Sequence, residues 1–223
     1  RRIATSSLWP GGETKREPGP FIWVEAEGSH QVAAARAKSM GIEKQVLVLE
    51  LGVDGLGQPD LSTEAHQKRL LEMTRDVKAI GVGIDSFGGS HSKAEGRIEQ
   101  VRPVLDYLAQ LARDTMTGVA TPQHLRKPAP GESVELTLYD VRGSTGITGW
   151  ARSVIVLEQG PENKMIFRQL KNNHGPLQAP MFTTVQYDQE GLPTEVQYDT
   201  YTEESEVPRP KRKTRQCIDW LES

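Results

Sequence analysis

The hydrophobic pattern of the chain alternates between short apolar runs and longer segments with helical character. The short runs, which are typical of β-strands, occupy residues 21–24, 45–51, 79–84 and 119–121. The segments with helical spacing or helix-start signals occupy residues 29–40, 63–73 and 94–113. Strands and helices therefore alternate as β-α-β-α-β-α-β, and this order predicts an α/β fold with a mainly parallel sheet flanked by helices.

Three of these segments support more specific predictions. Residues 79–84 show no polar alternation, which predicts a strand that is buried on both faces and lies inside the sheet. Ser29 is a candidate N-cap of the first helix, with Gly41 just past its end. The last helical segment has one apolar face, and we expect Pro103 to interrupt it because proline lacks an amide N–H. The apolar positions of that face are Ile98, Val101, Val104, Leu105, Leu108 and Leu111.

The pattern changes character after about residue 125. Strand-like runs separated by short turns lie at 153–158, 165–170 and 181–187. This spacing favours antiparallel hairpins. The tetrapeptide Val-Gln-Tyr-Asp occurs at 185–188 and again at 196–199, on either side of a turn, so two paired strands are expected there. We therefore predict antiparallel strands up to about residue 199.

The domain organisation follows from the length and from the composition of the C-terminal end. At roughly 150 residues per domain, 223 residues predict one domain with an appendage. We expect a core over residues 1–199 and a charged tail over residues 200–223, in which acidic residues precede basic ones. The basic run 209–215 is either a solvated tail or a patch that binds phosphate groups.

Composition excludes several classes of protein. The single cysteine, Cys217, cannot form an internal disulfide, and the chain has no cysteine spacing of a zinc ribbon. No apolar run approaches the ~18 residues of a membrane span, and the first residues lack the apolar core of a signal peptide. We therefore expect a cytoplasmic protein with no membrane contact. The net charge of −3 means that any nucleic-acid contact must come from a local patch, and the missing initiator Met suggests a chain that begins mid-protein.

Polar residues follow three of the predicted strands. Asp85 comes directly after the run 79–84, Glu27 follows the strand 21–24, and Gln123 with His124 follows the strand 119–121. The carboxyl ends of parallel strands form the edge at which α/β sheets bind ligands, so these groups are candidates for one site. The alternative is that each acid simply caps a turn or is solvated.

The chain resembles RecA-like ATPases of the replicative-helicase type, in particular the hexameric RepA-like helicases and their phage and plasmid relatives. The segments that carry the resemblance occur in the family's order at 9–10, 23–28, 80–85, 118–127, 141–144, 149–153 and 170–175. The resemblance covers residues 1–187 and implies a RecA-like fold with ATP and Mg²⁺ as cofactors.

The resemblance also implies roles for individual residues. Glu27 matches the carboxylate that polarises the attacking water, and Asp85 matches the Walker B aspartate that holds the magnesium shell. The γ-phosphate sensor matches Gln123, or His124 if the register slips by one. Arg152 and Lys171 match the two cations that reach the nucleotide of a neighbouring subunit, which implies a homo-oligomeric ring.

A contact with single-stranded DNA is implied in the same way. Arg142, Gly143 and Ser144 lie where the family has a loop that faces the central channel, and Lys127 is a further candidate for the same contact. Such a contact is expected to involve mainly phosphate groups, and therefore to be sensitive to salt and tolerant of base sequence.

The phosphate loop of the family, G-x-x-x-x-G-K-[ST], appears nowhere in the 223 residues. Without it the backbone cradle and the lysine for the β- and γ-phosphates are missing, so we expect this chain alone to be inactive in ATP hydrolysis. Two hypotheses therefore stand: the core of a helicase-type ATPase that acts on DNA, or a non-catalytic RecA-like interaction module without a P-loop.

Overall fold

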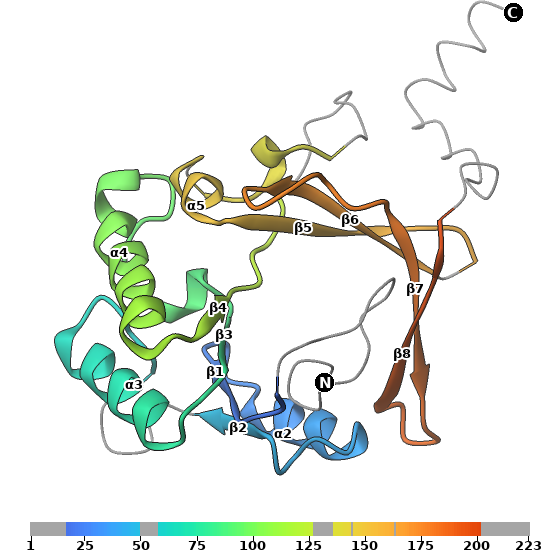
Figure 1. The fold of residues 1–223 in the computed structure, drawn as a ribbon, viewed down its shortest axis with the longest axis horizontal. Helices are drawn as coiled ribbons and strands as arrows, with labels where there is room; N and C mark the ends of the chain where they lie inside the picture. Colours follow the sequence, from blue (N-terminus) through green and yellow to red (C-terminus); the bar gives the residue numbers. More distant parts are fainter. Residues whose placement is uncertain (1–16, 50–57, 127–135, 144, 163, 202–223) are drawn as a thin grey trace, which may run out of the picture.

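The structure is a computed structural model and describes residues 17–49, 58–126, 136–143, 145–162 and 164–201. Within these ranges the chain forms two four-stranded sheets (Figure 1). The first is parallel, with strand order β2-β1-β3-β4, and the second is antiparallel, with strand order β5-β6-β7-β8. The predicted α/β fold, with a parallel sheet first and antiparallel strands after it, is confirmed.

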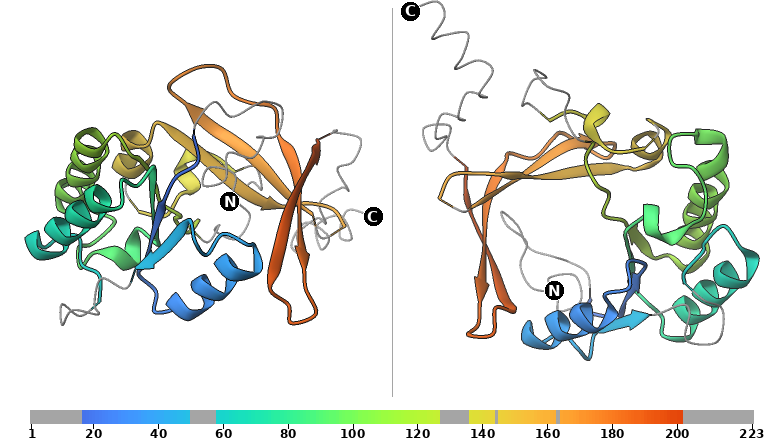
Figure 2. Two further views of the ribbon diagram at one scale, coloured as in Figure 1. Left: turned by 60° about the horizontal axis from the view of Figure 1, so that its bottom comes forward. Right: turned by 180° about the vertical axis from the view of Figure 1, so that it is seen from behind.

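The parallel sheet and its helices follow the alternation that the sequence predicts. The elements are β1 (Phe21–Glu25), α2 (His30–Ser39), β2 (Val46–Leu49), α3 (Glu64–Asp76), β3 (Gly81–Asp85), α4 (Ile98–Thr115) and β4 (Gly118–Ala120). Figures 1 and 2 show α3 and α4 side by side on one face of this sheet and α2 on the other. Helices on both faces are what right-handed crossovers give when the chain reverses its direction across the sheet after β2.

Strand β3 lies inside the sheet, between β1 and β4, as expected from its unbroken apolar run. Its residues from Gly81 to Ile84 are buried, whereas Asp85 at the carboxyl end is partly exposed. A Cβ atom at Gly81 or Gly83 would collide with the ring of Phe21 or of Trp23 on β1. These two glycines therefore allow the aromatic rings of β1 to lie against β3.

The hydrophobic core lies between the parallel sheet and the helices α3 and α4. Its fully buried side chains are Ile22, Val24, Leu61, Leu70, Val82, Ile84, Phe87, Val101, Val104, Leu105 and Leu108. The expected interruption at Pro103 is wrong, because α4 runs through this residue without a break. Proline in the second turn removes one backbone hydrogen bond, and the buried apolar face of α4 outweighs that loss.

The antiparallel sheet consists of hairpins, as its turn spacing predicts. Its strands are β5 (Ser153–Gln159), β6 (Met165–Asn172), β7 (Met181–Tyr187) and β8 (Pro193–Thr200). The repeated tetrapeptide lies on β7 and β8, where Val185 pairs with Val196. The two short 3₁₀ turns η1 (Gly88–Ser90) and η2 (Leu138–Asp140) and the helix α5 (Thr145–Trp150) complete the described elements. Helix α5 was not predicted, because a segment of six residues that includes Gly146 and Gly149 is too short to show a helical period.

The β7–β8 hairpin returns to the parallel unit, where β8 lies beside α2 (Figure 1). The hydroxyl of Ser39 at the end of α2 donates a hydrogen bond of 2.8 Å to the carbonyl oxygen of Pro193 at the start of β8. None of the helices in the described ranges has the length and apolar character that crossing a membrane requires.

Candidate functional site

The ends of β1 and β3 bring three carboxylates to one edge of the parallel sheet. Glu25 and Asp85 are partners in the register of the two strands, and Glu27 follows two residues after β1. The amide of Ala26 donates a 2.7 Å hydrogen bond to the carbonyl oxygen of Asp85, which extends the strand pairing into the turn. The structure therefore brings the predicted residues Glu27 and Asp85 to the same edge of the sheet, together with Glu25.

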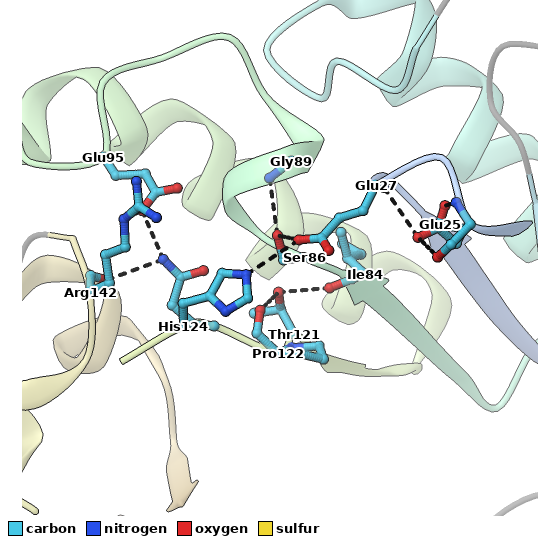
Figure 3. A network of polar contacts seen from close by, with 12 residues as sticks. Glu25, Glu27, Ile84, Ser86, Gly89, Glu95, Thr121, Pro122, His124 and Arg142 are labelled. Atoms are coloured by element: carbon cyan, nitrogen blue, oxygen red, sulfur yellow. Dashed lines mark hydrogen bonds and ion pairs between the residues drawn. The ribbon is translucent and has the colours of Figure 1, made fainter. Parts of the chain in front are cut away.

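The Glu27 carboxylate is held by two side chains from other strand ends (Figure 3). The Ser86 hydroxyl donates a 2.7 Å hydrogen bond to Oε1 of Glu27. Nε2 of His124, in the segment after β4, lies 3.5 Å from the same oxygen. The Glu27 side chain is 44% exposed, so this carboxylate is anchored through Oε1 and remains partly open to solvent.

The electrostatics of this edge are dominated by negative charge. Burial raises the pKa of Asp85, and the neighbouring carboxylates of Glu27 and Glu25 raise it further. Arg36 and His124 lower this pKa by smaller amounts. The charged form of Asp85 is therefore disfavoured as the site stands, and an added cation would relieve the repulsion.

Glu25 is a structural part of the site that the sequence reasoning missed. Its buried carboxylate accepts hydrogen bonds from the amide of Glu27 at 3.2 Å, the amide of Ser29 at 2.6 Å and the Ser29 hydroxyl at 3.0 Å. Ser29 occupies the predicted N-cap position of α2, but its side chain makes no capping bond and donates to Glu25 instead. Glu25 thus shapes the turn that presents Glu27. The available signal was a second acid two positions before Glu27.

Gln123 takes part in a different cluster from His124. Its Nε2 donates to Oε2 of Glu95 at 2.9 Å and to the carbonyl oxygen of Arg142 at 3.1 Å. Nε of Arg142 lies 3.9 Å from the same Glu95 oxygen, and the Arg142 side chain is 64% exposed. Of the two predicted sensor candidates, His124 therefore contacts Glu27, whereas the Gln123 amide connects β4 to the segment around Arg142. Glu95 is a further polar residue that the sequence reasoning missed.

The remaining candidates lie on the antiparallel part of the chain or outside the described residues. Nζ of Lys171 on β6 donates to the carbonyl oxygens of Thr148 at 2.8 Å and Gly149 at 3.1 Å, at the C-terminal end of α5. Arg152 is exposed at the start of β5. A role of either cation in a neighbouring subunit stays a prediction, because it requires a second copy of the chain.

The predicted nucleic-acid loop is described in part. Gly143 has a positive φ of +100°, which glycine adopts without strain, and a Cβ atom there would lie 2.7 Å from Cδ1 of Ile147. Lys127 and Ser144 lie outside the described residues. DNA contact at this loop stays a prediction.

A divalent cation at the carboxylate edge would have to be shared with another ligand. Within the described residues, no group of three or more His, Cys, Asp or Glu side chains could hold a metal ion by itself. Mg²⁺ is commonly held by one or two carboxylates together with phosphate and water oxygens, so a three-residue protein cage is not required. The uncompensated charge around Asp85 makes this carboxylate the residue that would contribute to such a shell.

Comparison with known proteins finds similarity among solved structures. No family model matches the chain, and no curated protein matches it either. Among solved structures, the chain is similar to the crystal structure of the KaiC-like protein PH0186 from the hyperthermophilic archaeon Pyrococcus horikoshii OT3. The identity is 18%, the TM-score is 0.49, and the alignment covers 82% of this chain and 77% of that one. A similarity of this size assigns neither a family nor a function.

Proposed function

We propose that the chain is a RecA-like ATPase core in which Glu27 orients the attacking water and Asp85 belongs to the Mg²⁺ shell. The observation that carries this proposal is the edge formed by the ends of β1 and β3, where the Glu27 carboxylate lies beside Asp85. Asp85 would help to hold Mg²⁺, which would supply positive charge to neutralise the charge that develops on the phosphate during phosphoryl transfer.

The geometry of Glu27 suits the task of orienting a water molecule. Its Oε1 is occupied by Ser86 and approached by His124, whereas Oε2 has no hydrogen-bond partner among the described residues. A water-positioning residue needs one anchored carboxylate oxygen and one that can accept from the nucleophile. Because the Glu27 side chain is 44% exposed, a water molecule can reach the carboxylate from solvent.

A further part of the proposal concerns the oligomeric assembly and the nucleic acid on which it acts. In this interpretation the parent protein is a replicative-helicase-type ATPase, and Arg142 with its neighbours meets single-stranded DNA. Arg152 and Lys171 would serve a nucleotide held by the adjacent subunit of a ring, through a head-to-tail contact. The side chain of Arg142 is 64% exposed, so its guanidinium can reach a phosphate group.

A non-catalytic interaction module is the second candidate function. It is favoured by one observation, the lack of a G-x-x-x-x-G-K-[ST] motif in the 223 residues. The natural sequence upstream of Arg1 discriminates between the two. A phosphate loop that ends shortly before Arg1 supports the ATPase, and a start codon at or just before it supports the module.

A binding experiment on the 223-residue chain tests the carboxylate edge directly. We expect Mg²⁺ at millimolar concentration to raise the melting temperature of the wild-type chain, because the cation relieves the repulsion around Asp85. Asp85→Asn should abolish this shift, whereas Glu99→Gln, on the exposed first turn of α4, should leave it intact. Equal shifts in the wild type and in Asp85→Asn would contradict the proposed metal role.

A hydrolysis assay tests the catalytic role. The 223-residue chain is expected to show no measurable turnover, while a natural form that carries a phosphate loop should hydrolyse ATP and lose this activity in Glu27→Gln. Turnover by the loop-containing form that survives Glu27→Gln would contradict the role of Glu27.

A further inference from the structure

We propose that Ser86 is the positioning residue of Glu27: it anchors Oε1 and thereby leaves Oε2 as the oxygen that receives water. This inference rests on the proposed function of Glu27. Its geometric basis is the 2.7 Å hydrogen bond from the Ser86 hydroxyl to Oε1, together with the burial of Ser86, which is 4% exposed. A buried donor holds its geometry better than an exposed one, because water does not compete for it.

The orientation of the Ser86 hydroxyl is determined by its second partner. The amide of Gly89 in η1 donates a 3.2 Å hydrogen bond to Oγ of Ser86. A hydroxyl carries one proton, so an oxygen that accepts from an amide still has this proton to donate. The Ser86 hydroxyl donates this proton to the carboxylate of Glu27. The two hydrogen bonds therefore run in one direction, from the Gly89 amide through Ser86 to Glu27 (Figure 3).

Backbone packing holds Gly89 and the Glu27 segment, which lie at the two ends of this series of hydrogen bonds, close together. A Cβ atom at Gly89 would lie 2.9 Å from the carbonyl oxygen of Ala26, so the turn η1 lies close against the residue before Glu27. The amide of Ala26 is in turn bonded to the carbonyl oxygen of Asp85. Ser86 and Glu27 are therefore brought together by contacts on both sides of their own hydrogen bond.

His124 is the weaker of the two contacts to Oε1. Its Nε2 lies 3.5 Å from the oxygen, which is the limit of a hydrogen bond, and its side chain is 67% exposed. An exposed imidazole exchanges its contacts with water, whereas the Ser86 hydroxyl is enclosed. We therefore assign the anchoring of Glu27 to Ser86 rather than to His124.

The first test detects the hydrogen bond without relying on enzymatic activity. In the full chain labelled with ¹³C, Ser86→Ala should displace the side-chain carboxyl resonance of Glu27. The matched control is Thr121→Val, which removes a nearby hydroxyl that donates to the carbonyl oxygen of Ile84 and has no bond to Glu27. Displacement by Ser86→Ala alone supports the proposal. An unmoved resonance, or equal displacement by the control, overturns it.

A second variant keeps the test decisive if Ser86→Ala does not fold. Gly89→Ala retains the Ser86 hydroxyl but forces the turn η1 away from Ala26, which weakens the amide that orients Ser86. We expect the Glu27 resonance to move in the same direction as in Ser86→Ala, by a smaller amount. No movement in a folded Gly89→Ala protein argues against the directed chain of donors and overturns the proposal.

Kinetics separate this inference from the proposed function. In a natural form that hydrolyses ATP, Ser86→Ala should lower kcat about 10- to 100-fold with little change in KM, because it affects the positioning of the nucleophile and not ATP binding. In a Glu27→Gln background, Ser86→Ala should cause no further loss of kcat. If no form hydrolyses ATP, the proposed function fails, while the resonance of Glu27 still decides whether Ser86 anchors it.

Discussion

The parallel and antiparallel parts of the molecule bury their residues in different ways. In β3 both faces are covered, and the four residues from Gly81 to Ile84 are all buried. In β5 burial alternates, so that Val156 and Glu158 are buried while Ile155 and Leu157 are 46% and 56% exposed. A strand enclosed on both faces has little freedom to shift, and the groups at its end are held accurately. This difference explains why the candidate site lies on the parallel sheet.

The two parts also differ in how they treat charge. On the antiparallel sheet the buried Glu158 is paired with Arg168 at 2.9 Å, and the Arg168 guanidinium lies 5.9 Å from the ring centre of Tyr201. At the parallel sheet edge, three carboxylates gather near the exposed imidazole of His124, and Arg36 offsets their charge only in part. The antiparallel sheet pairs its buried charge internally, whereas the edge of the parallel sheet retains a surplus of negative charge that a bound cation would neutralise. Charge left unbalanced at a strand end is the pattern of a functional site.

The largest expected effect separates the two regions by stability. Leu108→Ala removes a fully buried side chain of α4 and should lower the free energy of unfolding by roughly 2–5 kcal/mol. Leu157→Ala on β5 should cost less than about 1 kcal/mol, because more than half of this side chain is exposed. Urea unfolding of the two variants measures the difference. Similar losses in both would show that the two sheets share one equally buried core.

The second prediction concerns the internal ion pair. Arg168→Ala removes the guanidinium that pairs with the buried carboxylate of Glu158 and should cost about 1–3 kcal/mol, less than for a fully buried pair because the Arg168 side chain is 31% exposed. Adding Glu158→Gln to Arg168→Ala should recover part of this loss. Arg142→Ala, which breaks the exposed contact with Glu95, should cost at most ~0.5 kcal/mol. Equal costs in a denaturant series would remove the electrostatic contrast.

Lys171 offers a test of moderate size. Lys171→Met removes the donor to two carbonyl oxygens at the end of α5 and should lower stability by about 0.5–1.5 kcal/mol. Arg152→Met, at an exposed position nearby, is the control and should be nearly neutral. Thermal unfolding of the isolated chain compares them. A neutral Lys171→Met would leave its action in a neighbouring subunit as the better explanation of this lysine.

The smallest effect is a gain in stability. Because the pKa of Asp85 is raised in the folded chain by burial and by the neighbouring carboxylates, its charged form opposes folding above that pKa. Asp85→Asn should therefore stabilise the chain at pH 7, by less than about 1 kcal/mol since the group is partly exposed.

The pH dependence supplies the control for this gain. As the pH falls through the raised pKa, Asp85 becomes protonated in the folded wild type, and the advantage of Asp85→Asn should shrink. Denaturation at pH 7 and at acidic pH measures both values. Glu158→Gln on the other sheet should have the opposite sign at pH 7, because it weakens the pair with Arg168. A loss of stability in Asp85→Asn would show that the carboxylate is already compensated.

Much of the fold could be predicted from local pattern. The run 79–84 indicated an interior strand, and the tetrapeptide at 185–188 and 196–199 indicated a hairpin, because burial and pairing leave direct traces in the order of residues. Pro103 was misread because propensity is a local quantity, and the buried face of α4 outweighs the loss of one hydrogen bond. The short helix α5 has too few residues to show a period.

The candidate site could be predicted in outline but not in its contacts. Glu27 and Asp85 were found because each follows a strand and parallel strands end at one edge. Glu25 and Ser86, which bond to the Glu27 segment, and Glu95, which bonds to Gln123, could not be found in this way. Their roles depend on turns whose geometry the hydrophobic pattern does not specify.

The sequence by itself determined the order of the elements, the interior position of β3 and the edge at which the acids gather. These properties follow from hydrophobic period and from the direction of parallel strands, which are both readable along the chain. The tertiary structure alone decided that Ser86 meets Glu27, that Gln123 and His124 belong to separate clusters, and that Lys171 caps α5. Side-chain hydrogen bonds depend on positions to within a fraction of an ångström, and only the packed backbone defines these positions.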